Sequence, residues 1–464
     1  MPRPVPPLLR PRSSDEYAPL PPTTEDRRAV ARWRDVAPAS ARALGVDLAD
    51  YADDRRGTAA TLRAIDEAHG GGFFDLDEAT ERDEAAAAAA FGGDGPVVDV
   101  QTHLVDPNRF GNPGAGALAT FLEMVDPDRW RGGLDPVAVD GAAWASYVFG
   151  TSETAVALLT STPGPPDVNV LTNPGIAAAR DVVDRYAGTG RVLTHTIVHP
   201  NLGPGELEAM EGWRDELSPS GWKVYTLYGP PTAACPSGGW FLDDEEVGLP
   251  FLERVRQLGP TVVAAHKGLG GPIPSVSVAA ASPRDIGPAA RAFPDLTFVV
   301  YHSGYERDPL DEEGPYEPGR PGGGVDRLVE SLRLAGIGPG ANVYAELGST
   351  WYLVLRRPAE AAHVLGKLLV ALGPERILWG TDSVWYGSPQ PLIDAFRAFT
   401  IPPSYQERFG YPPLTDDVKN AILGGNARRV YPVRDEALAL AAVTEPTWVG
   451  AAAAELRRVV ASAS

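Results

Sequence analysis

The sequence predicts an α/β fold, a (β/α)8 TIM barrel with an N-terminal extension and C-terminal helices, on three observations. Between about Val97 and Tyr431, short runs of β-branched and aromatic residues alternate with helix-like stretches, as in repeated βα units around a parallel sheet. Eight such runs can be drawn, which is the number that closes this kind of barrel. No glycine-rich phosphate-binding turn follows any of them, so an open doubly wound sheet is only the alternative.

The expected elements follow in order along the chain. The strands are expected at 97–104, 155–161, 191–199, 222–227, 261–268, 296–304, 342–349 and 376–382. Stretches with helical periodicity fall between most of them, for example at 175–188, 324–336 and 359–373.

The chain divides into four parts by composition. Residues 1–24 are rich in proline and are expected to be extended over the surface or disordered. Residues 25–95 form a helical N-terminal extension, residues 96–432 the barrel, and residues 433–464 a C-terminal helix.

Charge and cysteine content limit the partners. The formal net charge of −20 disfavours binding to nucleic acid or to anionic membrane surfaces. No apolar run approaches the roughly 20 residues that span a bilayer. The only cysteine, Cys235, excludes an intrachain disulfide and fits a reducing compartment.

Polar residues gather where the expected strands end. In the run VVDVQTHLVDP, alternation places Asp99, Gln101 and His103 on one face of the first strand. The ends of the other expected strands carry His199, Lys223, Tyr225, His266, Lys267, His302, Glu346 and Asp382. Since active sites of such barrels lie at the carboxyl ends of the strands, this ring of imidazoles and carboxylates predicts a site for zinc, or for manganese or iron.

Eight motifs also carry a family resemblance. They are GGFFDLD at 71, DVQTHLVDP at 99, GWKVYT at 221, AHKGLG at 265, FVVYHSGYE at 298, VYAELGSTW at 343, GTDSVWYGSPQP at 380 and NARRVY at 426. In this order they resemble a bacterial subgroup of the amidohydrolase superfamily, within its amidohydrolase-2 branch of metal-dependent barrel enzymes.

The resemblance implies a set of metal ligands. The superfamily pattern of HxH on strand one, a histidine on each of strands five and six, and an aspartate on strand eight maps onto His103, His266, His302 and Asp382. Gln101 replaces the first histidine of HxH, which argues for one metal ion per chain and leaves open whether Gln101 binds it. Leu104 stands where the subgroup has a further histidine.

The resemblance also suggests roles. Asp382 would be a metal ligand and the base for a metal-bound water, and His302 a ligand or the group that polarises a carbonyl. Lys223 would contact the substrate or form an ion pair; the alternative is the carboxylated lysine that bridges two metals in other members. His199, Tyr305 and Glu346 are expected near the substrate.

Three further residues have structural interpretations. His195 is expected in the core, whereas His69 and His363 are expected at the surface.

The leading functional hypothesis is a metal-dependent hydrolase that cleaves an amide-like C–N bond or an ester-like bond, in a small molecule or a peptide, in a natural-product or peptide-tailoring pathway. The first alternative is a non-oxidative decarboxylase, which needs a cation for the substrate carboxylate; Lys223, Arg109 and Lys267 are candidates. The second is a non-catalytic binding barrel, motivated by Gln101 and Leu104.

Location and assembly follow from the same resemblance. Many members of the subgroup that the chain resembles carry a twin-arginine export signal before GGFFD. Here Arg55 and Arg56 remain, but Arg63, Asp66 and Glu67 interrupt the apolar run that export needs. The protein is therefore expected in the cytoplasm, and the resemblance is compatible with a homodimer.

Overall fold

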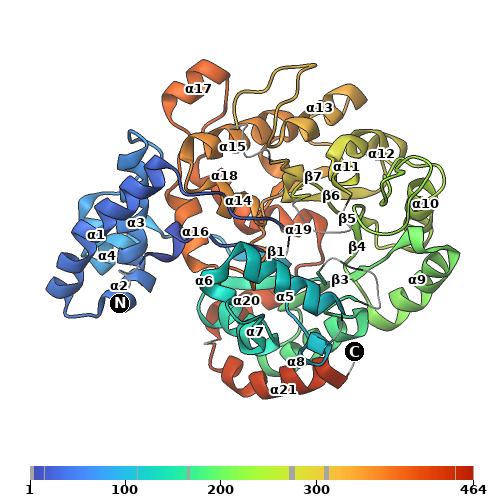
Figure 1. Ribbon diagram of the computed structural model, residues 1–464, viewed down its shortest axis with the longest axis horizontal. Coiled ribbons are helices and arrows are strands. Elements are labelled where there is room, and N and C mark those ends of the chain that lie inside the picture. The colour runs from blue at the N-terminus through green and yellow to red at the C-terminus, as the bar shows by residue number, and fades with distance from the viewer. Residues whose placement is uncertain are drawn as a thin grey trace.

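Eight parallel strands in sequence order form the centre of the molecule (Figure 1). The computed structural model describes residues 5–462 except 15, 112, 163, 165–167, 271–276, 308–312 and 445. The strands are β1 (Val97–Thr102), β2 (Thr154–Leu159), β3 (Val192–Ile197), β4 (Gly221–Tyr225), β5 (Val262–His266), β6 (Thr297–Tyr301), β7 (Val343–Glu346) and β8 (Ile377–Leu378).

Backbone hydrogen bonds join the last strand to the first. The Val100 amide donates to the Trp379 carbonyl at 3.0 Å, and the Asp382 amide donates to the Gln101 carbonyl at 2.9 Å. A parallel bridge between Thr102 and Ser383 continues the pairing. The predicted α/β barrel is therefore confirmed.

Helices surround the barrel and cover the outer faces of the strands (Figure 1). The longer ones are α5 (Pro113–Val125), α8 (Asn173–Ala187), α9 (Pro204–Leu217), α10 (Gly248–Leu258), α13 (Asp326–Ala335), α15 (Pro358–Leu372) and α16 (Gln390–Ala398). The shorter ones are α6 (Pro127–Trp130), α7 (Gly141–Ala145), α11 (Val278–Ala281), α12 (Ile286–Ala292), α14 (Thr350–Val354), α17 (Pro403–Phe409), α18 (Asp416–Asn420) and α19 (Ala427–Val430). Helices α8, α13 and α15 lie where the periodicity predicted them.

The N-terminal extension is a group of helices on one side of the barrel (Figure 1). It contains α1 (Thr24–Leu44), α2 (Leu48–Asp53), α3 (Arg55–Ala68) and α4 (Glu84–Ala90). Helix α1 begins with a capping box, in which Thr23 Oγ1 accepts from the Asp26 amide at 3.0 Å and the Asp26 carboxylate accepts from the Thr23 amide at 2.8 Å. It ends at Gly45, whose φ of 70° is the left-handed conformation that glycine adopts without strain.

The N-terminal segment, defined here as the described residues of 5–23, corrects an expectation. It is largely extended, but Leu8, Leu9, Tyr17 and Leu20 are buried, so the expectation of a surface or disordered segment is wrong for these residues. Its apolar side chains, spaced between prolines, pack onto the protein, and the Tyr352 hydroxyl donates to the Arg10 carbonyl at 2.7 Å. The segment reaches the carboxyl ends of the strands.

The C-terminal part forms two helices, α20 (Asp435–Val443) and α21 (Trp448–Ser462), which agrees with the predicted C-terminal helices but divides the single helix expected over 433–464. Pro446 lies between them, and proline is unfavourable inside a helix. Trp448 and Leu456 of α21 pack in one apolar cluster with Trp144 of α7 and Ile176 of α8. Among the residues that the structure describes, no helix is both long and apolar enough to cross a membrane.

Candidate active site

Five of the predicted site residues lie just at or beyond the carboxyl ends of the strands. They are His103 after β1, His266 at the end of β5, His302 after β6, Glu346 at the end of β7 and Asp382 after β8. All five are buried.

Several residues around this site have a strained backbone. His302, Ser303, Ser349 and Asp382 have φ of 58°, 53°, 54° and 60°, respectively. Non-glycine residues in this region cost on the order of 1–3 kcal/mol each, and they cluster at functional sites because surrounding packing must hold them there.

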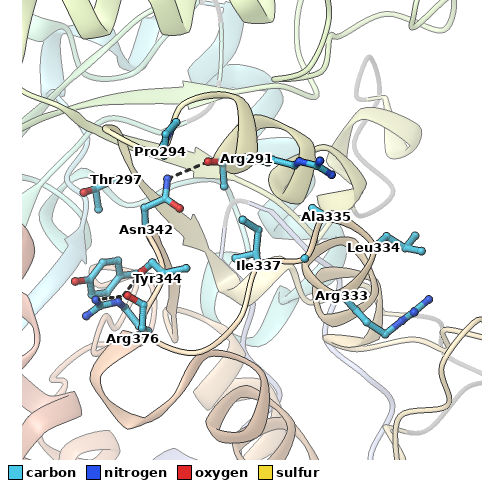
Figure 2. Close-up of a pocket in the computed structure, with 14 residues that line it drawn as sticks. Arg291, Pro294, Thr297, Arg333, Leu334, Ala335, Ile337, Asn342, Tyr344 and Arg376 are labelled. Atoms are coloured by element: carbon cyan, nitrogen blue, oxygen red, sulfur yellow. Dashed lines mark hydrogen bonds between the residues drawn. The ribbon is translucent and has the colours of Figure 1, made fainter.

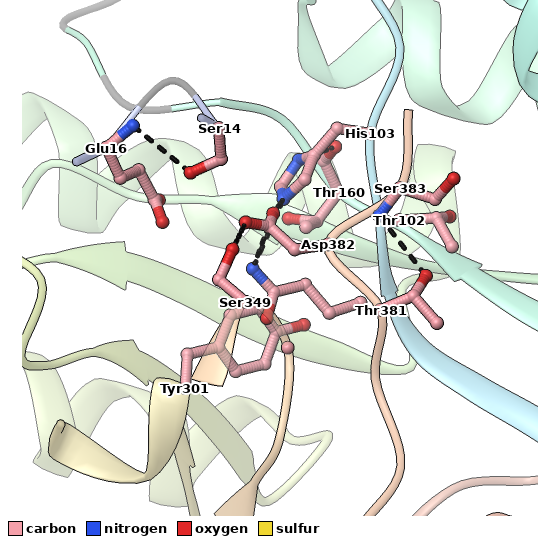
Figure 3. A network of polar contacts seen from close by, with 12 residues as sticks. Ser14, Glu16, Thr102, His103, Thr160, Tyr301, Ser349, Thr381, Asp382 and Ser383 are labelled. Atoms are coloured by element: carbon pink, nitrogen blue, oxygen red, sulfur yellow. Dashed lines mark hydrogen bonds and ion pairs between the residues drawn. The ribbon is translucent and has the colours of Figure 1, made fainter. Parts of the chain in front are cut away.

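The first part of the site is a histidine–aspartate pair. His103 Nε2 lies 3.0 Å from Asp382 Oδ1 (Figure 3). His103 Nδ1 lies 3.0 Å from the Thr160 carbonyl oxygen, an acceptor, so this nitrogen carries a hydrogen. Since neutral Nε2 and a carboxylate are both acceptors, a proton or a metal ion between them would make this contact favourable.

Neighbouring polar groups fix the Asp382 carboxylate. Gln101 Nε2 donates to Oδ1 at 3.0 Å. The Ser349 hydroxyl donates to Oδ2 (Figure 3). Gln101 Oε1 is buried and has no hydrogen-bond partner among the described residues. Gly348 packs against it so closely that a Cβ there would lie 2.2 Å from Oε1. In this arrangement Gln101 serves as a donor that orients Asp382.

The second part of the site is a cluster of Glu16, His266 and His302. His266 Nε2 lies 3.1 Å from the Gly268 carbonyl oxygen, and His302 Nδ1 lies 2.8 Å from the Gly348 carbonyl oxygen. These carbonyls hold each ring by one nitrogen and leave the other free to bind. The free nitrogens, His266 Nδ1 and His302 Nε2, lie 3.1 and 2.8 Å from the two carboxylate oxygens of Glu16.

This cluster can hold a metal ion. One ligand atom from each of its three residues lies within 4.8 Å of the others, and all three side chains are buried. The contacts to Glu16 are short enough for ion pairs but lack hydrogen-bond geometry, so four buried polar atoms converge without being satisfied. Imidazole nitrogens with a carboxylate suit zinc, manganese or iron.

The buried groups of the cluster shift one another's pKa values. Burial opposes ionisation of Glu16, but the charges of His302 and His266 hold the pKa of its carboxyl well below its usual range. Burial likewise disfavours charge on His302, yet Glu16, with Asp382 and Glu346, raises the pKa of His302 to about 9. For His266 burial dominates and lowers the pKa to about 4.

The structure thus places the predicted ligands in two adjacent parts. Within the described residues, His103 and Asp382 do not join His266 and His302 in one group of metal-binding size. The consecutive residues Gly348 and Ser349 connect the parts, because one contacts His302 and the other contacts Asp382.

Sequence reasoning missed Glu16. No motif surrounds it, and the only signal in its favour is an acidic residue within a segment whose leucines and tyrosine need a place to pack.

Two other predicted residues lie close to these parts. The Lys223 Nζ atom lies 3.2 Å from the centre of the Tyr301 ring and 4.5 Å from that of Tyr225, which stacks on His266. Glu346 accepts from the His302 amide at 3.0 Å, and burial raises the pKa of its carboxyl to about 7.

The remaining predicted contacts lie apart. The Tyr305 hydroxyl is directed to Glu360 at 3.4 Å. His199 lines a separate small pocket of about 170 Å³ with Asn173, Glu206 and Trp213.

Two candidate cations and two further histidines complete the comparison with the sequence predictions. Lys267 does not offer a cation to the site, because its Nζ atom lies 2.7 Å from Asp285 Oδ2, and both side chains are fully buried. Arg109 donates to the Asn169 carbonyl. His195 is in the core, as predicted, with Nδ1 3.2 Å from the Tyr301 hydroxyl. His363 was expected at the surface, which is wrong: α15 packs it against Tyr411, whose hydroxyl lies 2.8 Å from Nδ1.

Two large grooves lie outside this site. One, of about 970 Å³, is bordered by Thr297, Asn342 and Arg376, which begin or precede β6, β7 and β8 (Figure 2). It is therefore at the amino ends of the strands, opposite the site. The other, of about 910 Å³, lies along the N-terminal segment at Tyr17 and Leu20 and reaches Leu269 and Arg307, beyond β5 and β6.

Comparisons with known proteins place the chain in a family. The Amidohydrolase family model, Amidohydro_2, matches residues 98–433. No curated protein matches the chain. The similar solved structures include 2,6-dihydroxybenzoate decarboxylase from Rhizobium, with 15% identity and a TM-score of 0.41 over 73% of this chain and 99% of that chain. They also include 5-carboxyvanillate decarboxylase from Sphingomonas paucimobilis, with 13% identity and a TM-score of 0.43 over 74% and 100%.

A third is amidohydrolase 2 from Bifidobacterium longum subsp. infantis, with 13% identity and a TM-score of 0.37 over 74% and 100% of the two chains. At these identities and scores, the structural similarities do not establish a shared activity. The family model covers most of the chain, including nearly the whole barrel and every strand-end residue described above. The chain therefore belongs to the amidohydrolase-2 family.

Proposed function

We propose that the protein is a metal-dependent, non-oxidative decarboxylase of a small aromatic or enoic carboxylic acid. His266 and His302 hold the metal ion, which is zinc, manganese or iron. The His103–Asp382 pair supplies a proton to the carbon atom that loses carbon dioxide. This reaction was the first alternative to hydrolysis in the sequence analysis, and the site favours it over hydrolysis.

One observation carries the proposal: a cluster that can hold a cation and a histidine–aspartate pair that can share a proton lie side by side in a buried site. The side chains of His103, His302 and Asp382 are 0% exposed, and those of His266 and Glu16 are 1% and 2% exposed. A carboxylate that enters such a site loses its hydration. The negative charge becomes more dispersed as carbon dioxide leaves. The lack of hydration therefore destabilises the transition state less than it destabilises the bound carboxylate.

The reaction needs two things from the protein. The bond between the substrate carbon and its carboxylate breaks, carbon dioxide leaves, and the electron pair stays on the carbon, which must then take a proton. A bound divalent cation supplies the positive charge that holds the carboxylate. A proton shared between His103 and Asp382 would be available for the carbon, and Lys223, beside Tyr301 and Tyr225, would add positive charge.

Hydrolysis has less support from the same geometry. It needs a water molecule and a base with a free lone pair directed at that water. Both oxygens of Asp382 are already engaged, by His103 and Gln101 on one side and by Ser349 on the other. The N-terminal segment also covers the site.

The test compares carbon dioxide release with hydrolysis. Protein loaded with MnCl2 or ZnCl2 is incubated with hydroxybenzoates and enoic acids and, separately, with amides and lactones. We expect carbon dioxide from an acid and, in D2O, deuterium at the vacated carbon. Asp382→Asn should lower this rate by roughly 10²-fold or more, the usual contribution of general acid catalysis.

Asp215→Asn makes the same chemical change at an exposed position of α9 and should leave the rate unchanged. Amide or lactone hydrolysis without carbon dioxide release would replace the proposal by the hydrolase. Neither reaction with fully metal-loaded protein would favour the binding barrel.

A further inference from the structure

We propose that Glu16 is a ligand of the metal ion, so that metal binding and docking of the N-terminal segment over the site are one event. This inference rests on the metal site of the proposed function and adds a ligand from outside the barrel. It also assigns the segment a role, as a lid that the metal holds closed.

The position of Glu16 supports direct metal binding. Its carboxylate faces the two ring nitrogens that the carbonyls of Gly268 and Gly348 leave free. Without a cation, these nitrogens and the carboxylate are all acceptors that repel one another in a buried site. A divalent cation satisfies all three at once, whereas a single proton satisfies one nitrogen and leaves the other without a donor.

Among the described residues of the barrel, no carboxylate lies in one group of metal-binding size with His266 and His302. On β1, an amide occupies the position of Gln101, and its Nε2 donates to Asp382, so this residue adds no negative charge near the histidines. Two imidazoles alone bring no charge to balance a divalent ion. Glu16 brings one negative charge to them, whereas Glu346, at the end of β7, is occupied by the amides of His302 and Gly348.

The segment contacts both parts of the site through two successive residues. Next to Glu16, the Tyr17 hydroxyl lies 2.8 Å from the Tyr386 hydroxyl, which lies 2.6 Å from the Ser349 hydroxyl that donates to Asp382. Arg12 Nη1 forms an ion pair with Asp126 at 2.9 Å on the way into the site. Figure 3 shows the Glu16 carboxylate directed toward the region of Asp382 and Ser349.

Because the site is closed in this arrangement, a substrate enters only when the segment moves aside. The groove of about 910 Å³ is lined in part by Tyr17 and Leu20 of the segment, so such a movement would widen it. Because the two equilibria are linked, the free energy that Glu16 contributes to metal binding equals the free energy by which the bound metal stabilises the docked segment.

The experiment measures metal affinity and segment docking separately, in the full-length protein after chelator treatment. Titration with MnCl2 gives the affinity for the wild type, for Glu16→Gln and for Glu16→Asp. Glu25→Gln, in the first turn of α1, is the matched control. We expect a loss of at least about tenfold in affinity for Glu16→Gln, since even outer-sphere partners of metal ligands contribute 10–100-fold. Glu16→Asp should fall between, and Glu25→Gln should match the wild type.

Trypsin reports docking, because it cleaves after Arg12, whereas Arg10 precedes proline and is resistant. In the wild type, Mn²⁺ should slow cleavage of the Arg12–Ser13 bond by about tenfold or more. In Glu16→Gln, the cleavage rate should no longer depend on Mn²⁺. Equal thermal unfolding of the metal-free proteins will show that the variants fold alike.

The outcomes separate this inference from the proposed function. Wild-type affinity in Glu16→Gln, with decarboxylation intact, would overturn the inference and leave the proposed function standing. Tighter Mn²⁺ binding by Glu16→Gln would also overturn it, because Glu16 would then compete with the metal. Weaker binding with loss of Mn²⁺-dependent protection would support the inference even if no decarboxylation is found. Absence of Mn²⁺ binding by the wild type would overturn both.

Discussion

Replacement of Lys267 by methionine tests whether this lysine holds the fold together or binds the substrate. Lys267 was a candidate cation for a substrate carboxylate, but its Nζ atom lies 2.7 Å from Asp285 Oδ2 and 3.1 Å from the Ala280 carbonyl oxygen. Lys267→Met keeps the length of the side chain and leaves the buried carboxylate of Asp285 without its counter-charge.

The expected loss of stability follows from this burial. Removal of one partner of a buried ion pair costs about 3–5 kcal/mol, since the remaining charge stays desolvated. For a chain of 464 residues, an unfolding entropy of about 2.1 cal/mol/K per residue gives roughly 1 kcal/mol per degree, hence a Tm lower by about 3–5 °C. The double variant Lys267→Met/Asp285→Asn also removes the unpaired carboxylate charge of Asp285. It should therefore be more stable than the sum of the two single losses predicts.

The assay is urea unfolding followed by circular dichroism, with decarboxylation measured in parallel. Lys419→Met is the control, because the partner of Lys419, Asp416, has a 94% exposed side chain and keeps its hydration. The control should lose only about 1 kcal/mol. If Lys267→Met unfolds at the wild-type urea concentration but shows a strongly raised KM for an acid substrate, the structural interpretation of Lys267 is refuted.

Three further predictions concern the site and its surroundings. His266→Ala should abolish metal binding. His103→Ala should keep the metal and lose activity if His103 and Asp382 move the proton. Elemental analysis measures the metal content, and loss of metal in both variants would favour the ligand set implied by the motifs. Burial lowers the pKa of His199 to about 4, below the ordinary 6.5, so the folded protein binds fewer protons than the unfolded chain between these values. The free energy of unfolding is therefore unaffected by this residue above pH 6.5 and should fall by about 3 kcal/mol as the pH is lowered to 4. Urea unfolding should show this fall in the wild type and not in His199→Asn. A Cβ at Gly380 would lie 1.8 Å from Glu346 Oε1, so Gly380→Ala should displace Glu346 from the His302 amide and lower the free energy of unfolding by about 1–3 kcal/mol. Gly116→Ala, which has open space at its Cβ, should leave it unchanged. Equal urea midpoints for the two variants would contradict this packing.

Much of the barrel could be predicted because its determinants are local. Runs such as 97–104 and 296–304 show their strand character in a few neighbouring residues, and helices such as α8 and α15 show a periodicity within one segment. The order of the strands then follows from connections that are short and of one handedness. For the same reason His103, His266, His302 and Asp382 could be assigned to strand ends before their neighbours were known.

The partners of these residues could not be predicted, because they depend on contacts between distant parts of the chain. Glu16 meets His266 and His302 across some 250 or more residues, and no local pattern encodes that meeting. Lys267 looked available until the fold placed Asp285 beside it, and His363 looked exposed until Tyr411 covered it.

The sequence by itself therefore determined the architecture, the family motifs and the strand ends that carry the chemistry, since periodicity and motif spacing are properties of short segments. Only the tertiary structure decided how those residues are grouped. It separated the His103–Asp382 pair from the cluster of Glu16, His266 and His302 and brought the N-terminal segment against both. The physical reason is that the charge state and role of a buried group depend on what lies within a few ångströms of it, and folding brings those neighbours from anywhere in the chain.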